Sequence, residues 1–162
     1  MLFLLLSLVF GCRNKSKLPD ETANNKTEES VSVNKGPEIP GVPKEVLIRL
    51  LNECTYVDYI FHTLPFSISQ AEDPSIDQNI SFIDYTKPLG HIPKECKSIG
   101  RKFFHIKGEI VYDVDVYLTN NCKFYVFIGK DKKPMFANYM TEAGVKFYAH
   151  MAQQARGSMN QQ

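Results

Sequence analysis

The chain has 162 residues, of which 43% are hydrophobic, and it carries 19 Lys and Arg against 18 Asp and Glu. This length corresponds to one domain, and the composition is too apolar for a wholly disordered chain and, with four cysteines, too poor in cysteine for a disulfide scaffold. Because contacts to phosphate groups require clustered Lys and Arg, a formal net charge of +1 argues against a nucleic-acid partner.

The N-terminal residues form an apolar segment that ends in a cysteine. Residues 2–10 are apolar or neutral without interruption. This run is too short to cross a bilayer, which takes about 20 residues, and a short apolar run that ends in a small residue is typical of a secretory signal. The alternative is a buried hydrophobic strand that is followed by an incidental cysteine.

The residues Val9, Phe10, Gly11 and Cys12 resemble the lipobox of bacterial lipoproteins, in which an aliphatic residue and two mostly small residues precede a cysteine. The resemblance implies that residues 1–11 are a signal peptide and that Cys12 carries the lipid, for example palmitate. It also implies a membrane anchor in the bacterial cell envelope, and we expect the outer membrane.

Residues 12–42 are predicted to comprise the lipidated cysteine and a flexible tether. Between residues 13 and 42, ten of thirty residues are charged and none is aromatic, so the segment cannot bury enough apolar surface to offset its ordering entropy. As a flexible coil it would span on the order of 30 Å. We expect one folded head over residues 43–155 and a frayed polar tail over residues 156–162.

The first part of the head is predicted to be mainly helical. Pro43 suits the first turn of a helix, and the apolar residues that follow are spaced close to the 3.6-residue helical period. These residues are Leu47, Ile48, Leu51, Cys54 and Val57. We therefore expect a helix over residues 43–62, a loop over residues 67–77 and a short strand around Ile80 and Phe82.

The second part of the head shows the alternation of apolar side chains that is typical of strands, most clearly over residues 109–118. The predicted elements are strands at 99–106, 109–118, 122–128 and 134–140 and a helix at 142–154. The predicted fold class is therefore α+β, with an antiparallel β-meander of about four strands packed with an N-terminal and a C-terminal helix.

A three-residue loop at 119–121 would set Val116 opposite Phe124, so that apolar side chains face each other across the two strands. On this register Tyr117, Tyr125 and Phe127 lie on the opposite face of the sheet. A sheet that carries aromatic side chains on both faces must be covered on both faces or expose an apolar patch that favours association. Either the two helices cover one face each, or these three residues dock a protein partner.

The head contains three cysteines, and Cys96 and Cys122 are the more plausible disulfide pair, with Cys54 left over. In a strict meander the two cysteines would flank the middle strand at about 10 Å, beyond the Cα separation of about 7 Å that a disulfide tolerates. A disulfide therefore requires Cys96 to cross over the end of that strand. Three buried free thiols are the alternative.

A second hypothesis for the head is a metal carrier, because soft ligands that suit copper are present. They are His91, Cys96, Cys122, Met135, Met140, His150 and Met151. In broad layout the chain resembles copper-accessory lipoproteins of the envelope. No CxxC, HxxxH or Cys-x-Met pattern is present, so we expect no metal site and no cofactor, and we interpret the methionines as core or edge residues.

Catalysis is not expected, since the sequence contains no GxSxG, HExxH, GxGxxG or P-loop motif. Asp113 and Asp115 share one face of a predicted strand, at a separation that carboxylate pairs use in glycoside chemistry. Arg101 or Lys102 on the neighbouring strand would lie beside them, which favours a cross-strand ion pair on a solvated face.

As a whole the head resembles short membrane or secreted proteins of Gram-negative bacteria, a resemblance that implies a location and no activity. The sequence therefore predicts a lipid-anchored cell-envelope protein, held to the membrane through Cys12, with a small non-catalytic α+β module that binds an envelope protein partner. The alternative is a copper-type carrier or accessory lipoprotein.

Overall fold

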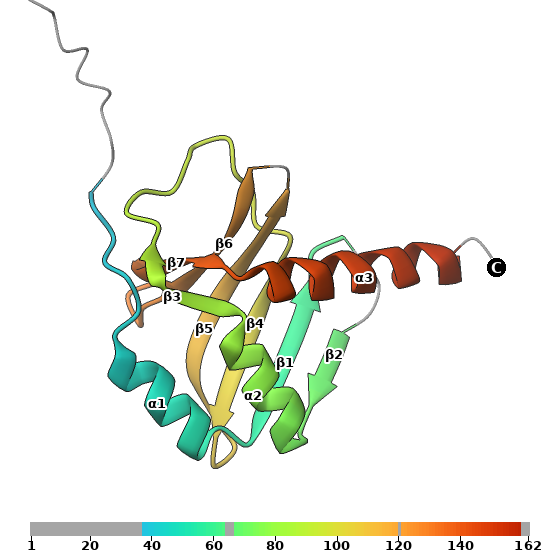
Figure 1. Cartoon of the computed structure of the whole chain (residues 1–162), viewed down its shortest axis with the longest axis horizontal. Helices are drawn as coiled ribbons and strands as arrows, with labels where there is room; N and C mark the ends of the chain where they lie inside the picture. The colour runs from blue at the N-terminus through green and yellow to red at the C-terminus, as the bar shows by residue number, and fades with distance from the viewer. Residues whose placement is uncertain (1–36, 64–66, 120, 160–162) are drawn as a thin grey trace, which may run out of the picture. The chain divides into compact units, whose positions relative to one another are not determined.

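The computed structural model describes residues 37–63, 67–119 and 121–159, which form an α+β domain (Figure 1). The predicted signal peptide, the lipobox at residues 9–12 and most of the predicted tether lie outside the described residues. No described helix combines the length and the apolar character that crossing a membrane requires.

Within the described residues, three helices accompany one seven-stranded antiparallel sheet. The helices are α1 (Lys44–Glu53), α2 (Asp73–Ser81) and α3 (Glu142–Met159). The strands are β1 (Tyr56–Phe61), β2 (Ser67–Gln70), β3 (Ile83–Pro88), β4 (Gly100–Ile106), β5 (Glu109–Thr119), β6 (Cys122–Ile128) and β7 (Pro134–Met140). The order across the sheet is β2-β1-β4-β5-β6-β7-β3.

The four predicted strands of the meander are confirmed as β4 to β7, which are neighbours in the sheet in chain order. The predicted number of strands was too small, because β1 and β2 extend the sheet beyond β4 and β3 extends it beyond β7. The C-terminal helix is also longer than predicted, since α3 continues to Met159 and includes part of the predicted frayed tail.

The predicted helix over residues 43–62 is wrong in its second half. The α-helix ends at Glu53, Cys54 has an extended backbone, and the next residues form β1. The sequence YVDYIF of β1 is rich in β-branched and aromatic residues, which favour a pleated strand, and β1 pairs along its length with β4. The predicted loop over residues 67–77 is wrong, because it contains β2 and the start of α2. The strand expected around Ile80 and Phe82 is wrong at those residues, because Ile80 lies in α2 and Phe82 is its C-cap, and β3 begins at Ile83.

The predicted register between the second and third strands of the meander is also wrong. Leu118 pairs with Lys123 and Val116 pairs with Tyr125, so two residues rather than three connect β5 to β6. The sequence pattern could not separate the two registers, because β6 carries large apolar side chains on both faces. The shorter connection is the commoner type of hairpin loop. Lys123 is exposed at the end of the sheet, so its pairing with Leu118 costs little stability.

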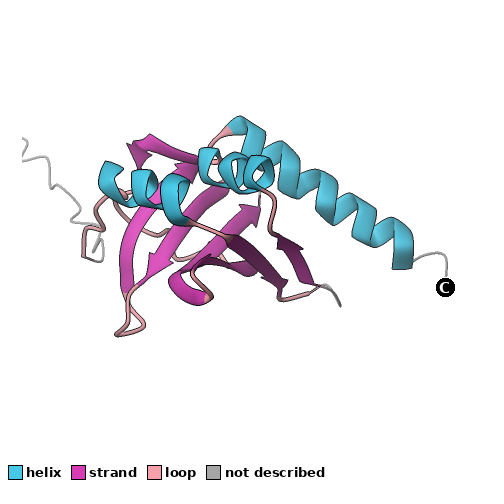
Figure 2. Ribbon diagram, turned by 90° about the horizontal axis from the view of Figure 1, so that it is seen from below, coloured by secondary structure: helices cyan, strands magenta, loops and turns pink. Residues whose placement is uncertain are grey.

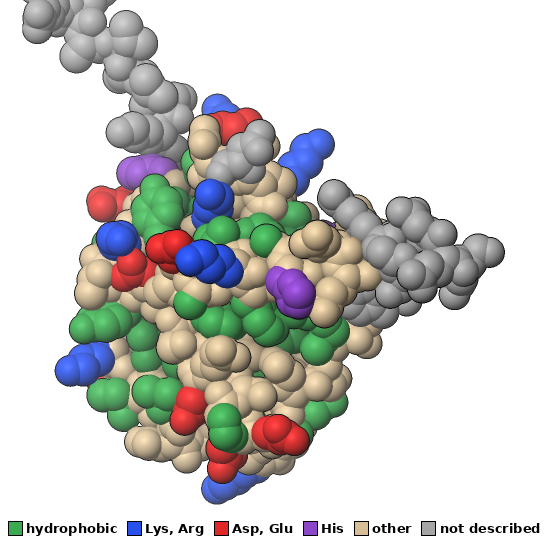
Figure 3. All heavy atoms as spheres, turned by 45° about the vertical axis from the view of Figure 1, so that its right-hand side comes forward, with side chains coloured by type: hydrophobic (Ala, Val, Ile, Leu, Met, Phe, Trp, Pro, Cys, Tyr) green, Lys and Arg blue, Asp and Glu red, His purple; other side chains and the backbone are tan. Residues whose placement is uncertain are grey.

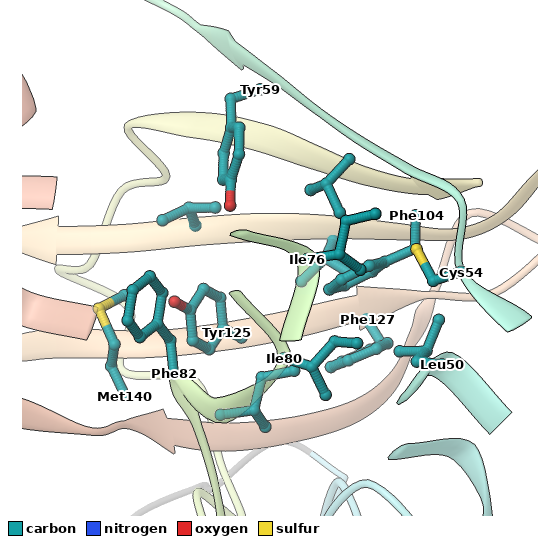
Figure 4. Packing of buried hydrophobic residues seen from close by; sticks show 14 of the residues in the cluster. Leu50, Cys54, Tyr59, Ile76, Ile80, Phe82, Phe104, Tyr125, Phe127 and Met140 are labelled. Carbon is teal, nitrogen blue, oxygen red and sulfur yellow. The ribbon is translucent and has the colours of Figure 1, made fainter. Parts of the chain in front are cut away.

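All three helices pack on one face of the sheet (Figure 2), so the interpretation in which each face carries one helix is wrong. The helix side chains in this core are Leu47 and Leu50 from α1, Ile76 and Ile80 from α2, and Tyr148 and Met151 from α3. Figure 4 shows Leu50, Ile76 and Ile80 gathered against Phe104, Tyr125 and Phe127 of the sheet.

The other face of the sheet is partly covered by irregular chain. Phe124, Val126 and Ala137 form a second apolar cluster, against which Ile39 and the segment 89–96 pack. The amide of Ile39 donates to the carbonyl of Gly90 at 2.6 Å, and the amide of Ala137 donates to the carbonyl of Pro40 at 2.9 Å. Residues 39–42 therefore belong to the folded head, which begins earlier than the predicted boundary at residue 43.

Candidate functional site

The predicted docking residues do not form one surface. Tyr125 and Phe127 have no exposed area, because the observed register turns them toward the helices. The prediction that these two residues dock a partner is therefore wrong. Tyr117 lies on the opposite face, where it is half-buried and its ring stacks on that of Phe124 with centroids 4.4 Å apart.

Cys96 and Cys122 form a disulfide, with their Cα atoms 5.7 Å apart. The segment before β4 crosses the end of β5 and so brings Cys96 to the first residue of β6, which is the crossing that the disulfide required. Cys54 is a free and buried thiol that donates to the carbonyl of Tyr56, and burial raises its pKa.

The soft side chains that suggested a metal carrier are dispersed. Cys96 and Cys122 are oxidised and supply no thiolate, while Met140 and Met151 are buried in the core beneath the helices. Among the described residues, no three His, Cys, Asp or Glu side chains lie close enough together to hold a metal ion.

The cross-strand ion pair predicted for the two aspartates is present on the face opposite the helices. The Arg101 Nε atom lies 2.8 Å from Asp115 Oδ1 and 3.2 Å from Asp113 Oδ1, and burial raises the pKa of the Asp113 carboxyl. Between the adjacent strands β4 and β1, His105 Nε2 lies 3.1 Å from Asp58 Oδ2. In this cluster the carboxyl groups of Asp58, Asp113 and Asp115 each lie against the side chain of His105 or Arg101.

Lys102, the other cation considered for that pair, points to the helix side instead. It is fully buried, and its ammonium nitrogen lies 4.4 Å from the ring centre of Tyr125 and 4.9 Å from that of Phe104. The nitrogen donates a long hydrogen bond of 3.4 Å to the carbonyl of Asn79. Because it is buried, the pKa of Lys102 falls to about 7.

An apolar groove that is open to solvent lies between α1 and β3 and has a volume of about 410 Å³. We call it the α1–β3 groove. It is lined by Lys44, Leu47, Ile48 and Leu51 from α1, by Ile83, Asp84 and Tyr85 from β3, and by Ile80, Ser81 and Thr141 at the ends of the neighbouring elements. The lining residues of α1 follow the spacing of a single helix face.

Three large side chains of this groove are exposed to solvent: Ile48 at 46%, Leu51 at 50% and Tyr85 at 57%. Single exposed apolar side chains are normal on proteins. Figure 3 shows such side chains between charged groups on one face of the molecule. The α1–β3 groove differs because its exposed apolar side chains line a concave site, the usual form of a binding site.

The sequence signal for this groove is an excess of apolar residues in α1. Five of the six residues from Val46 to Leu51 are apolar, which is more than one buried face can accommodate. Leu47 and Leu50 enter the core, whereas Ile48 and Leu51, two of the apolar residues at helical spacing in the sequence, remain at the surface. The contribution of Tyr85 was missed because β3 was not predicted at these residues.

The β3 side of the groove is held in a defined shape. The Asp84 carboxylate accepts hydrogen bonds from the Thr86 amide at 3.2 Å and from the Thr86 hydroxyl at 2.6 Å, and it lies 3.1 Å from the Lys87 ammonium. These contacts, led by the bond from the Thr86 hydroxyl, lower the pKa of Asp84. The Asn138 amide also donates to the Asp84 carbonyl at 2.8 Å.

Comparisons of this chain with protein-family models, with curated proteins and with solved structures find no match.

Proposed function

We propose that this protein is a lipid-anchored protein of the bacterial cell envelope whose α+β head binds a protein partner without catalysis. The observation that carries the proposal for the head is the α1–β3 groove, which is concave, apolar and open to solvent. Burial of its exposed side chains by a partner would be favourable at about 25 cal/mol for each Å² of apolar surface.

The anchor in this proposal is supported by the resemblance of Val9, Phe10, Gly11 and Cys12 to a lipobox. The polar composition of residues 13–36 supports a tether, because such a segment has few apolar side chains to bury. As a flexible coil, these residues would give the head a reach of about 25 to 30 Å from the membrane. A binding head on such a tether can meet partners near the membrane surface.

A non-catalytic role is supported by the state of the polar groups. The carboxyl groups of Asp113 and Asp115 lie against Arg101, and that of Asp58 lies against His105. Cys54 and Lys102 are buried, where a substrate has no access to them. Among the residues that the structure describes, the lining of the α1–β3 groove carries no histidine or cysteine.

The proposal is tested by placing a photo-crosslinking amino acid at Leu51 of the full chain and irradiating the cells that produce it. We expect a specific adduct with an envelope protein. The matched control carries the same amino acid at Ile60, which is equally exposed, at 51% against 50%, but lies in β1 away from the groove. The adduct should disappear when Ile48→Glu is added, because a carboxylate at that position makes the groove unfavourable for an apolar partner.

Two results would contradict the proposal. Equal yields of adduct at Leu51 and Ile60 would show that the partner does not bind preferentially at the groove. A chain extracted from its own membranes with residues 1–11 present and no acyl mass at Cys12 would remove the anchor.

A further inference from the structure

The backbone of β3 beside the α1–β3 groove is left without a partner strand over several residues. β3 is the last strand of the sheet on its side, so no strand of the described residues pairs with its outer edge. Its pairing with β7 passes directly from the pair Ile83–Met140 to the pair Pro88–Asn138, so that residues 84–87 have no paired residue in β7. An open strand edge of this kind can accept hydrogen bonds from, and donate them to, an added strand.

This open edge lies beside the apolar side chains of α1. Ile83, Asp84 and Tyr85 form one wall of the groove, while Ile48 and Leu51 form the other. In an extended peptide, alternate side chains point to opposite faces, so every second side chain of a peptide laid along β3 could enter the space between the strand and the helix. The combination of a strand edge with a neighbouring helix therefore suits an extended chain with alternate apolar residues.

The charges of the groove indicate a further property of its occupant. Lys44 and Asp84 are the charged residues of the lining, and Asp84 is already paired with Lys87 at 3.1 Å. Lys44 has no ion-pair partner within residues 37–63, 67–119 and 121–159. The groove therefore carries one uncompensated positive charge, at the N-terminal end of α1, which complements a carboxylate.

We infer that the α1–β3 groove binds an extended apolar segment of a partner protein as an additional strand on β3, with a carboxylate of that segment close to Lys44. This inference rests on the proposed function and specifies how the partner is held. The Asp84 carbonyl and the Thr86 amide are already engaged within the domain, so main-chain hydrogen bonds to Tyr85 and Lys87 align the segment. Alternate apolar side chains of the segment fill the space next to α1. A lipid surface fits less well, because it meets convex apolar side chains more readily than the side chains of a concave groove.

The inference can be tested with the full chain in lipid nanodiscs and a library of fluorescent peptides. Each peptide has about ten residues, alternates Val, Ile or Leu with Ser or Thr, and carries Glu or Lys at one end. We expect members ending in Glu to bind, as measured by fluorescence anisotropy, and Leu51→Glu to weaken that binding at least tenfold. The control Ile60→Glu should leave it unchanged, and Lys44→Glu should reverse the preference in favour of peptides ending in Lys.

The strand geometry has its own readout. N-methylation of alternate amides of the best peptide on the edge facing β3 should abolish binding, and methylation on the other edge should not. Hydrogen exchange in residues 83–88 should slow when the unmethylated peptide is added. Binding that is equally strong for both methylated peptides would overturn strand addition while leaving the proposed function intact.

Three other outcomes would also overturn the inference. The first is the absence of binding throughout the library. The second is slower hydrogen exchange in residues 83–88 caused by the nanodisc lipid alone. The third is a dimer in native mass spectra that is lost in Leu51→Glu, which would show that a second copy covers the groove. The first outcome is distinguishable from a failure of the proposed function, because the crosslink at Leu51 in cells reports partner binding in any geometry.

Discussion

Replacing Lys102 with methionine should stabilise the domain and remove a specific part of its pH dependence. Lys102 is fully buried against the rings of Tyr125, Phe104 and Tyr59, and its ammonium group donates a long hydrogen bond to the carbonyl of Asn79. No carboxylate is in contact with its ammonium group within the described residues. Methionine has a similar length and carries no charge that must be removed from water.

The magnitude follows from the pKa of Lys102, which is about 7 in the folded protein against an ordinary value of 10.5. Between these two values the unfolded chain binds a proton that the folded chain does not, so the free energy of unfolding rises with pH. At 1.36 kcal/mol per pKa unit, the cost to the folded state is about 4 kcal/mol at pH 7 and about 2 kcal/mol at pH 9. The pKa in the folded protein already includes the attraction of the ammonium to the aromatic rings, so the net gain at pH 7 is at most about 4 kcal/mol.

The assay is urea unfolding of the wild-type chain, Lys102→Met and Lys123→Met at pH 7, 8 and 9. Lys123 is an exposed residue of β6 and controls for the removal of one positive charge. We expect the unfolding free energy of the wild type and of Lys123→Met to rise by about 2 kcal/mol over this range, and that of Lys102→Met to stay nearly level. An equal slope in all three proteins, or a strong loss of stability in Lys102→Met, would refute the account of the buried amine.

The structure carries further predictions for stability and location. Phe127→Ala should destabilise the domain by about 3 to 5 kcal/mol in urea unfolding, because it leaves a cavity beneath the helices; a change below 1 kcal/mol would contradict its burial. Cys96→Ser opens a disulfide with a sequence separation of 26 residues and should cost about 3 to 4 kcal/mol, whereas the same unfolding curve with and without reductant in the wild type would argue against the link. Cys12→Ser should release the protein from membranes in a fractionation experiment, and retention in the membrane pellet would count against lipid anchoring.

The meander could be predicted because β4 to β7 follow one another in the chain and pair with their sequence neighbours. The remaining strands depend on pairings that a local pattern does not contain. β1 pairs with β4 across the whole of β2, α2 and β3, and β3 closes the far edge of the sheet against β7. Local periodicity therefore extended the first helix into β1.

The candidate site could be predicted only in part, for a related reason. The ion pairs of Arg101 and the disulfide follow from neighbouring strands and from the crossing of one strand end. The docking prediction for Tyr125 and Phe127 depended on the register of one hairpin, and a shift of one residue exchanges the two faces of a strand. The α1–β3 groove requires α1 and β3 to meet, although about 30 residues separate them in the chain, so neither element reveals it alone.

The sheet also separates the free cysteine from the disulfide. Cys54 lies in the core on the helix side, whereas Cys96 and Cys122 belong to the apolar cluster on the other side. Exchange between a thiol and a disulfide requires a thiolate to reach a sulfur atom directly, and a layer of paired backbone now stands in that path. Burial further disfavours the Cys54 thiolate by raising its pKa. An odd number of cysteines in the head is therefore compatible with one lasting disulfide in an oxidising compartment, without scrambling once the sheet has formed.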